Sequence, residues 1–182
     1  LEAFSHPRNV GVRAITINEG DEVVDVRLTN GRNQLILANR NGRAVRFDET
    51  DVRAMGRTAT GVCGMKPDDD GQDEVVGMIV VNDPKTESVM VVSQEGYGKR
   101  SEVEDYRMTR RGAKGVKTLN ITEKTGKLVA IKNGTDDNDP MIINQSGIVI
   151  RMAVAEVRVM GRNTQGVRLI NLAKKNDVIA SV

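Results

Sequence analysis

The chain has 182 residues, a formal net charge of +2 and one cysteine, which excludes an internal disulfide and fits a reducing compartment. No apolar stretch is long enough for a membrane span, and the first residues do not have the pattern of a secretory signal. Aromatic residues make up only 2% of the chain, so the apolar side chains are mainly aliphatic, and together with 18 glycines they favour strands and turns over helices.

Short apolar runs recur along the chain and predict strands. One series lies at 23–26, 75–78, 128–131 and 178–182, and a second lies at 35–38, 89–92 and 141–143. Each run of the second series leads into a polar turn that ends in Gly42, Gly96 or Gly147, which is typical of a β-hairpin. A strand such as 44–47 follows each turn, then an arginine-rich loop, then a last strand at 62–65, 116–119 or 167–170. Four strands in about fifty residues are the size of a propeller blade.

Three segments, 42–62, 96–116 and 147–167, carry nearly the same pattern at offsets of 54 and 51 residues. We therefore expect an all-β, β-propeller-like single domain over 1–182, with repeats at about 1–20 (partial), 21–72, 73–125, 126–175 and 176–182 (partial). The arrangement predicted is an open partial array of three full four-stranded blades flanked by partial blades, cut from a longer protein. A short helical turn within 152–160 is the alternative for that segment, because its apolar residues have helical spacing.

Arginine recurs at three matching places in these segments. We call them the first column (Arg46, Arg100, Arg151), the second column (Arg53, Arg107, Arg158) and the third column (Arg57, Arg111, Arg162). The repeated arms 39–65, 93–119 and 144–170 carry net charges of +2, +3 and +3, whereas the connector 66–92 carries −5. Positive charge confined to one part of each repeat indicates a polyanionic partner.

Glycine-flanked loops at 55–61, 109–115 and 160–166 hold the third column. Glycine lets a backbone approach a surface closely, and arginine suits phosphate oxygens, so the loops favour a sequence-independent grip on DNA. The alternative is that the loops are structural turns whose arginines bind backbone carbonyls of the next blade. The middle loop favours DNA, because Arg110, Arg111 and Lys114 lie within five residues and Lys99, Arg107 and Lys117 flank them.

The segment Thr109-Arg-Arg-Gly-Ala-Lys-Gly115 resembles the box Gln-Arg-Arg-Gly-Gly-Lys-Gly of the C-terminal domain of DNA gyrase A, with differences at Thr109 and Ala113. The run 52–62 is similar to the degenerate repeats of that domain. The resemblance implies a six-bladed β-pinwheel whose blades exchange strands and whose positive rim wraps DNA. The C-terminal domain of ParC, the corresponding protein of topoisomerase IV, is the close alternative.

The resemblance also implies the wider context. The chain would bind double-stranded DNA and support ATP-dependent negative supercoiling by a type II topoisomerase, together with the rest of gyrase A and with gyrase B. It would lie in the bacterial cytoplasm, associated with the nucleoid, and the catalytic tyrosine would lie outside this chain. A propeller-like protein-interaction scaffold and a propeller enzyme are the other function classes, although no acidic or histidine cluster supports an enzyme.

The candidate residues follow from the columns and the box. Tyr106 is expected in the core and Tyr97 on a surface strand, and we expect no catalytic, metal or cofactor site. The expected box-like segment is Thr109, Arg110, Arg111, Gly112, Ala113, Lys114 and Gly115. The expected DNA-binding residues are Arg46, Arg53, Arg57, Lys99, Arg100, Arg107, Arg110, Arg111, Lys114, Lys117, Arg151, Arg158 and Arg162.

Overall fold

Three β-hairpins form the frame of the fold, and each is built at one of the predicted glycine turns. The computed structural model describes residues 1–172 and 177–182. In each turn the glycine amide donates to the carbonyl three residues earlier at 3.1 Å, as in Gly42 to Asn39. Gly42 has a φ of 82°, a value that glycine adopts without strain. The hairpins are β1 (Gln34–Asn39) with β2 (Arg43–Asp48), β4 (Ser88–Ser93) with β5 (Tyr97–Glu102), and β8 (Met141–Asn144) with β9 (Val149–Arg151).

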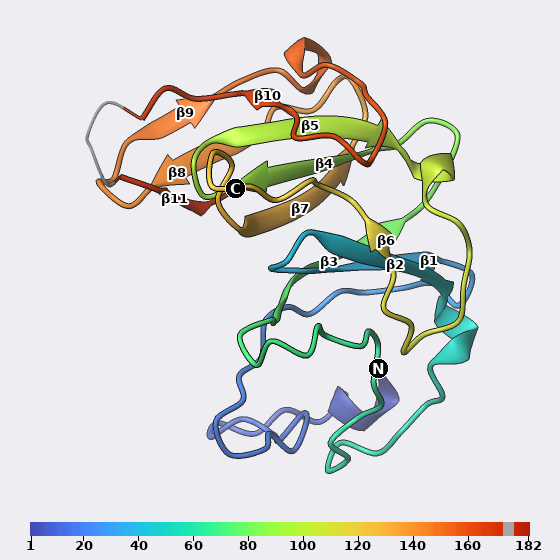
Figure 1. Cartoon of the computed structure of the whole chain (residues 1–182). Helices are drawn as coiled ribbons and strands as arrows, with labels where there is room; N and C mark the ends of the chain where they lie inside the picture. The colour runs from blue at the N-terminus through green and yellow to red at the C-terminus, as the bar shows by residue number, and fades with distance from the viewer. Residues whose placement is uncertain (173–176) are drawn as a thin grey trace.

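Each hairpin is completed by strands from the repeat that follows it. In the first sheet β3 (Val75–Val81) pairs with β1 and β6 (Val116–Lys117) pairs with β2, giving the order β3-β1-β2-β6. In the second, β7 (Leu128–Gly134) and β10 (Val167–Arg168) give the order β10-β5-β4-β7. The third has the order β11-β8-β9, with β11 at Ile179–Ser181. Figure 1 shows the first sheet below the other two, with the blue N-terminal segment beyond it.

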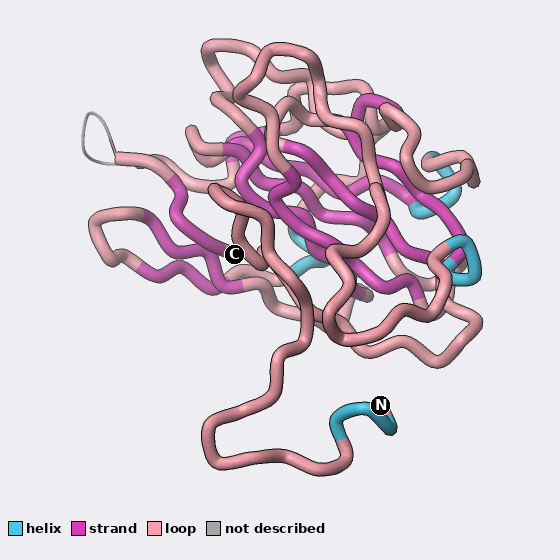
Figure 2. The backbone as a smooth tube through the Cα atoms, turned by 90° about the horizontal axis from the view of Figure 1, so that it is seen from below, coloured by secondary structure: helices cyan, strands magenta, loops and turns pink. Residues whose placement is uncertain are grey.

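The all-β, propeller-like class is confirmed, but the number of complete blades differs from the expected three. The described residues form two four-stranded sheets and one three-stranded sheet. The expected strands at 23–26 and 62–65 are absent from the sheets, and Val23, Val24 and Val26 are 52%, 51% and 76% exposed. The equivalent strands β3 and β6 both pair with the preceding hairpin, and residues 1–22 form no such hairpin. Figure 2 shows this N-terminal segment extending away from the sheets.

The core lies between successive sheets. Ile36, Val89, Tyr106 and Leu119 belong to one buried cluster at the first junction, and Met90, Ile142 and Val157 belong to another at the second. Tyr106 is fully buried, as predicted.

After each hairpin the chain makes one turn of 3-10 helix, which includes the helical turn considered within 152–160. These turns are η2 (Glu49–Asp51), η3 (Val103–Asp105) and η4 (Val154–Glu156), and η1 (Glu2–Phe4) is their N-terminal counterpart. The repeat boundaries remain predictions, and the last of them, at 175/176, falls outside the described residues.

Candidate nucleic-acid interface

First-column arginines hold adjacent blades together where a following repeat exists. Arg46 is 4% exposed, and its Nη1 donates to the carbonyls of Val103 and Tyr106 at 3.0 and 2.9 Å. Arg100 is 8% exposed and donates through Nε to the Val157 carbonyl at 2.7 Å. Both therefore bind the 3-10 turn of the next repeat. Arg46 also donates to Gln34 Oε1 and Arg100 to the Asp136 carboxylate, so protein groups engage both guanidinium groups. The expected DNA contact of Arg46 and Arg100 stays a prediction, which this burial disfavours.

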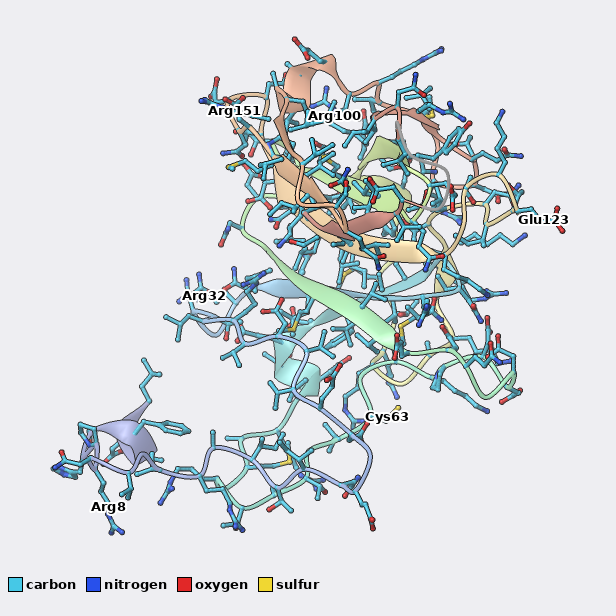
Figure 3. All side chains as sticks on the ribbon, turned by 90° about the vertical axis from the view of Figure 1, so that its left-hand side faces the viewer. Arg8, Arg32, Cys63, Arg100, Glu123 and Arg151 are labelled. Carbon is cyan, nitrogen blue, oxygen red and sulfur yellow. The ribbon has the colours of Figure 1, made fainter. Side chains whose placement is uncertain are left out.

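The third-copy member of that column behaves differently. Arg151 is 73% exposed at its side chain and forms an ion pair with Asp139. No 3-10 turn of a further repeat covers it among the described residues. Burial of the first column is thus produced by the neighbouring blade and not by the hairpin on which the arginine lies. Figure 3 shows Arg151 and Arg100 on the upper part of the molecule, far from Arg8 in the N-terminal segment.

Third-column arginines fasten each glycine-flanked loop to the loop before it. Arg111 donates to the carbonyls of Asp51 (2.9 Å) and Cys63 (3.1 Å). Arg162 donates to the carbonyls of Asp105 (3.0 Å) and Lys117 (3.1 Å), which occupy the same repeat positions as Asp51 and Cys63.

Arg57 makes the equivalent contact at the N-terminal end of the array. It donates to the Arg13 carbonyl at 2.9 Å, and Arg13 is at the repeat position of Cys63 and Lys117. The structural alternative for these arginines is therefore right about backbone carbonyls but wrong about the direction, because the acceptors belong to the preceding repeat and not to the next blade.

Lys99 is also part of the blade contacts and not of the rim. Its side chain is fully buried, and its ammonium donates to the carbonyls of Gly161 (2.7 Å) and Arg162 and to Thr164 Oγ1 (3.1 Å). The pKa of Lys99 is lowered to about 8, mainly because burial disfavours the charged ammonium; the charge of Asp105 opposes this shift and that of Arg162 adds to it. The expected DNA contact of Lys99 stays a prediction, which the burial of its ammonium against three acceptors disfavours.

The box-like segment is folded onto the preceding blade by its backbone. The amides of Thr109 and Gly112 donate to the carbonyls of Arg46 (2.8 Å) and Gly64 (2.6 Å). Gly115 has a φ of +76°, and a Cβ there would collide with the backbone carbonyl of Ala44, so only glycine fits. Ala113 makes a parallel bridge with Met65. Five of the seven box residues, Thr109, Arg111, Gly112, Ala113 and Gly115, therefore serve the contact between blades.

A second set of cations remains open to solvent. The second-column residues Arg53, Arg107 and Arg158 are exposed, and within residues 1–172 and 177–182 their guanidinium groups make no hydrogen bond or ion pair. In the box, Arg110 and Lys114 are exposed, and Lys114 lies 3.6 Å from Asp69. Lys117 is exposed as well. These six residues, Arg53, Arg107, Arg110, Lys114, Lys117 and Arg158, are here called the rim cations.

The third-column contacts bring the rim cations of successive repeats into one series. Arg111 binds the carbonyl of Asp51, two residues before Arg53. Arg162 binds the carbonyl of Asp105, two residues before Arg107. Each loop thus contacts the backbone two residues before the exposed arginine of the preceding repeat. The arrangement can present positive charge continuously along successive blades, as a polyanion that follows the array requires.

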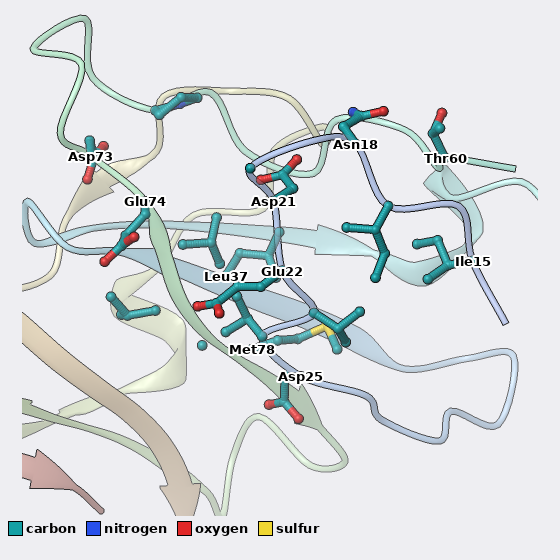
Figure 4. Close-up of a pocket in the computed structure, with 18 of the residues that line it drawn as sticks. Ile15, Asn18, Asp21, Glu22, Asp25, Leu37, Thr60, Asp73, Glu74 and Met78 are labelled. Atoms are coloured by element: carbon teal, nitrogen blue, oxygen red, sulfur yellow. The ribbon is translucent and has the colours of Figure 1, made fainter. Parts of the chain in front are cut away.

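The hollow at the N-terminal end of the array is unsuited to a polyanion. It has a volume of about 1190 Å³ and lies between residues 15–25 and the first sheet. Figure 4 shows five carboxylates around it, and their negative charge would repel a phosphate backbone. The five are Asp21, Glu22, Asp25, Asp73 and Glu74.

Within the described residues no group of His, Cys, Asp and Glu side chains is arranged to hold a metal ion. The same residues contain no helix long and apolar enough to span a bilayer.

The reasoning from sequence missed a third group of residues at the second blade. Tyr97 is only 6% exposed, which corrects its expected surface position, and Arg168 of β10 pairs with it. Lys124 lies over the same ring. The signal was present, because Arg168 occupies the repeat position of Lys117, two residues after the closing glycine. Tyr97 was missed because its burial depends on β10, a strand borrowed from the next repeat.

Comparison with known proteins agrees with this architecture. The family model described as DNA gyrase C-terminal domain, beta-propeller, matches residues 5–30, 33–82, 87–133 and 141–182. The chain belongs to this family. Among curated proteins, the DNA gyrase A protein of Klebsiella oxytoca is 42% identical over 180 residues, and that of Staphylococcus aureus strain MRSA252 is 43% identical over 172 residues. These matches cover 98% and 94% of the chain but only 20% and 19% of the relatives, so the chain spans about a fifth of their length.

Two solved structures have a fold similar to that of this chain. A DNA gyrase A C-terminal domain aligns with a TM-score of 0.85 at 26% identity, covering 94% of this chain and 57% of that one. The C-terminal domain of a DNA topoisomerase IV aligns with a TM-score of 0.90 at 25% identity, covering 99% and 55%. The all-β, propeller-type fold and the recognition of the gyrase A C-terminal family are both confirmed.

Proposed function

We propose that this chain binds, bends and wraps duplex DNA without reading its sequence, as the C-terminal module of gyrase A. The observation that carries the proposal is the second column: Arg53, Arg107 and Arg158 are exposed once per repeat with their guanidinium groups unengaged by the described residues. Arginine and lysine that neutralise phosphates release condensed counterions, which supplies affinity independent of sequence. Bending 20–30 base pairs costs roughly 1–6 kcal/mol, and cations spaced one cluster per blade offset that cost along the path.

Single-stranded nucleic acid is disfavoured as the ligand, because it is bound through exposed aromatic platforms. Three of the four aromatic residues, Phe47, Tyr97 and Tyr106, are 2%, 6% and 0% exposed. The same burial disfavours either tyrosine as the nucleophile that cleaves DNA. We therefore assign the DNA cleavage and ATP hydrolysis of the holoenzyme to parts outside this chain, with the rest of gyrase A and gyrase B as its partners at the bacterial nucleoid.

Two alternatives remain for the proposed activity. The fold comparison alone does not separate gyrase from topoisomerase IV, since both structures align well. The curated relatives at 42% and 43% identity favour gyrase A and thus a role in negative supercoiling. A protein-interaction scaffold would use the same blades but would bind duplex DNA no better than a charge-matched control protein.

A salt titration of duplex binding tests the proposal. Fluorescence anisotropy with a labelled duplex, repeated over a range of salt concentrations, gives the slope of log K against log salt. Six rim cations predict a slope of about −5, at about −0.9 per neutralised phosphate. A ring-closure assay on a short duplex measures bending in parallel, and we expect faster closure with the chain present. Binding as weak as that of the charge-matched control would contradict the proposal.

A further inference from the structure

The second blade carries a pair of cations that the DNA path through the rim cations does not include. Arg168 lies beside Tyr97 in the β5–β10 pair, with its Cζ 5.3 Å from the ring centre. Its Nη2 donates to the Tyr97 hydroxyl at 3.1 Å and its Nη1 donates to Asn171 Oδ1 at 3.0 Å. The guanidinium is therefore fixed in place by an aromatic ring and an amide, both uncharged.

Lys124 reaches the same ring from a different loop. Its ammonium lies 5.5 Å from the centre of Tyr97, and both Lys124 and Arg168 are exposed to solvent. The ring attracts both cations, but it does not neutralise them. Within the described part of the chain, neither has a carboxylate within 4.0 Å, although Glu123 precedes Lys124 in the sequence. Figure 3 labels Glu123, which projects outward from its loop. Two positive charges therefore lie within 5.5 Å of the centre of one ring without a counter-charge, and a bound anion would lower their electrostatic energy.

The equivalent place on the first blade is built in the opposite way. There Lys117 pairs with Arg43 in the strand register, and Arg43 lies 3.6 Å from Asp68. The loop that contributes Lys124 to the second blade has an equivalent in the first blade, and Asp70 occupies the position of Lys124 in that loop. The first blade therefore has carboxylates of its own at this place, whereas the second blade has two cations there that an anionic ligand could bind.

We propose that Arg168 and Lys124, held by the ring of Tyr97, form a phosphate-binding site for the backbone of duplex DNA. The site rests on the proposed function, and it adds the Tyr97 end of the second blade to the DNA path. Exposed guanidinium and ammonium groups bind phosphate oxygens through charge-assisted hydrogen bonds. Because the guanidinium is already ordered, little side-chain freedom is lost on binding.

Tyrosine fluorescence can report this site directly. The chain has no tryptophan and two tyrosines, of which Tyr106 is fully buried with its hydroxyl on Thr118. Tripolyphosphate, which does not absorb near 280 nm, is the probe. We expect a saturable change in emission that is lost in Arg168→Gln/Lys124→Gln. The matched control, Arg32→Gln/Lys85→Gln, removes one arginine and one lysine at exposed positions away from Tyr97 and retains the change.

Duplex binding by the same variants separates failure of the site from failure of the proposed function. We expect the double variant to flatten the salt slope by about 1.8, at 0.9 per phosphate contact, relative to the matched control. Duplex binding with an unchanged slope, together with unchanged emission, overturns the site and leaves DNA wrapping standing. Tripolyphosphate binding at Tyr97 without any duplex binding overturns the proposed function, and with it duplex DNA as the ligand of this site, but leaves the phosphate site itself standing. If the double variant does not fold, as judged by circular dichroism, Lys124→Gln on the exposed loop gives the same test with half the expected slope change.

Discussion

The buried and exposed arginines of this chain differ in role although they recur with the same period. Arg46 and Arg53 are seven residues apart; one is 4% exposed and binds carbonyls of the next blade, and the other is exposed to solvent. The same division holds between Arg100 and Arg107. A recurring arginine in a repeat array is therefore not by itself evidence of a ligand contact. What distinguishes the two roles is whether the next repeat supplies carbonyl acceptors.

The largest effect is expected from removing a buried first-column arginine. Arg46→Ala leaves the carbonyls of Val103 and Tyr106 without a donor at a buried junction. Hydrogen bonds to charged groups contribute about 1.5–3 kcal/mol, so we expect the free energy of unfolding to fall by about 3 kcal/mol. Urea denaturation followed by circular dichroism measures the change.

Arg151→Ala is the control for that experiment, since Arg151 belongs to the same column as Arg46 but is exposed to solvent. Its ion pair with Asp139 is on the surface, and such pairs contribute less than about 1 kcal/mol. Equal losses for Arg46→Ala and Arg151→Ala would show that burial by the next blade is not what gives Arg46 its role.

A smaller loss of stability is expected inside the box, where Arg111 binds backbone carbonyls and its neighbour Arg110 is exposed. Arg111→Lys keeps the charge but loses the planar pair of donors that bind the carbonyls of Asp51 and Cys63. We expect it to lower the free energy of unfolding by about 1–2 kcal/mol and to weaken duplex bending. Arg110→Lys keeps the charge at an exposed position and leaves both unchanged. Denaturation and ring closure on the two variants measure the difference, and a more severe effect at position 110 would reverse the assignment.

A further effect is expected at the buried Lys99, and it depends on pH. Its pKa is about 8 in the folded chain and 10.5 ordinarily, so between these values the unfolded chain holds more protons. Its contribution to the free energy of unfolding is therefore constant below pH 8 and rises with pH from 8 to 10.5, by at most about 1.4 kcal/mol per pH unit. We expect the difference between wild type and Lys99→Met to grow in favour of wild type from about pH 7.5 to about pH 9.5. A difference that stays constant across this range would contradict the burial of the ammonium.

Much of the fold could be predicted from the sequence, because local signals specify it. Apolar runs of strand length and the turns at Gly42, Gly96 and Gly147 specify the three hairpins. The exchange of strands could not be derived from the residues, since the runs that contain β6 and β10 predict strands but do not show which hairpin these strands pair with. The missing strands at 23–26 and 62–65 follow from that exchange.

The candidate site was predicted less completely than the fold. The columns were visible in the sequence, but a guanidinium suits a carbonyl as well as a phosphate, and residue type does not distinguish them. Arg111 and Arg110 are adjacent in the box and yet face opposite surroundings. Only the path of the neighbouring repeat's backbone decides which of them is available to DNA.

The central claim is that the second column contacts DNA while the first and third columns hold the blades together. The most direct test is the salt dependence of duplex binding by the triple variant Arg53→Gln, Arg107→Gln and Arg158→Gln. The account predicts a slope that is smaller in magnitude by about 2.7, at 0.9 per lost contact. It also predicts a free energy of unfolding within about 0.5 kcal/mol of wild type, because surface substitutions rarely cost more. An unchanged slope, or a loss of stability as large as that of Arg46→Ala, would contradict it.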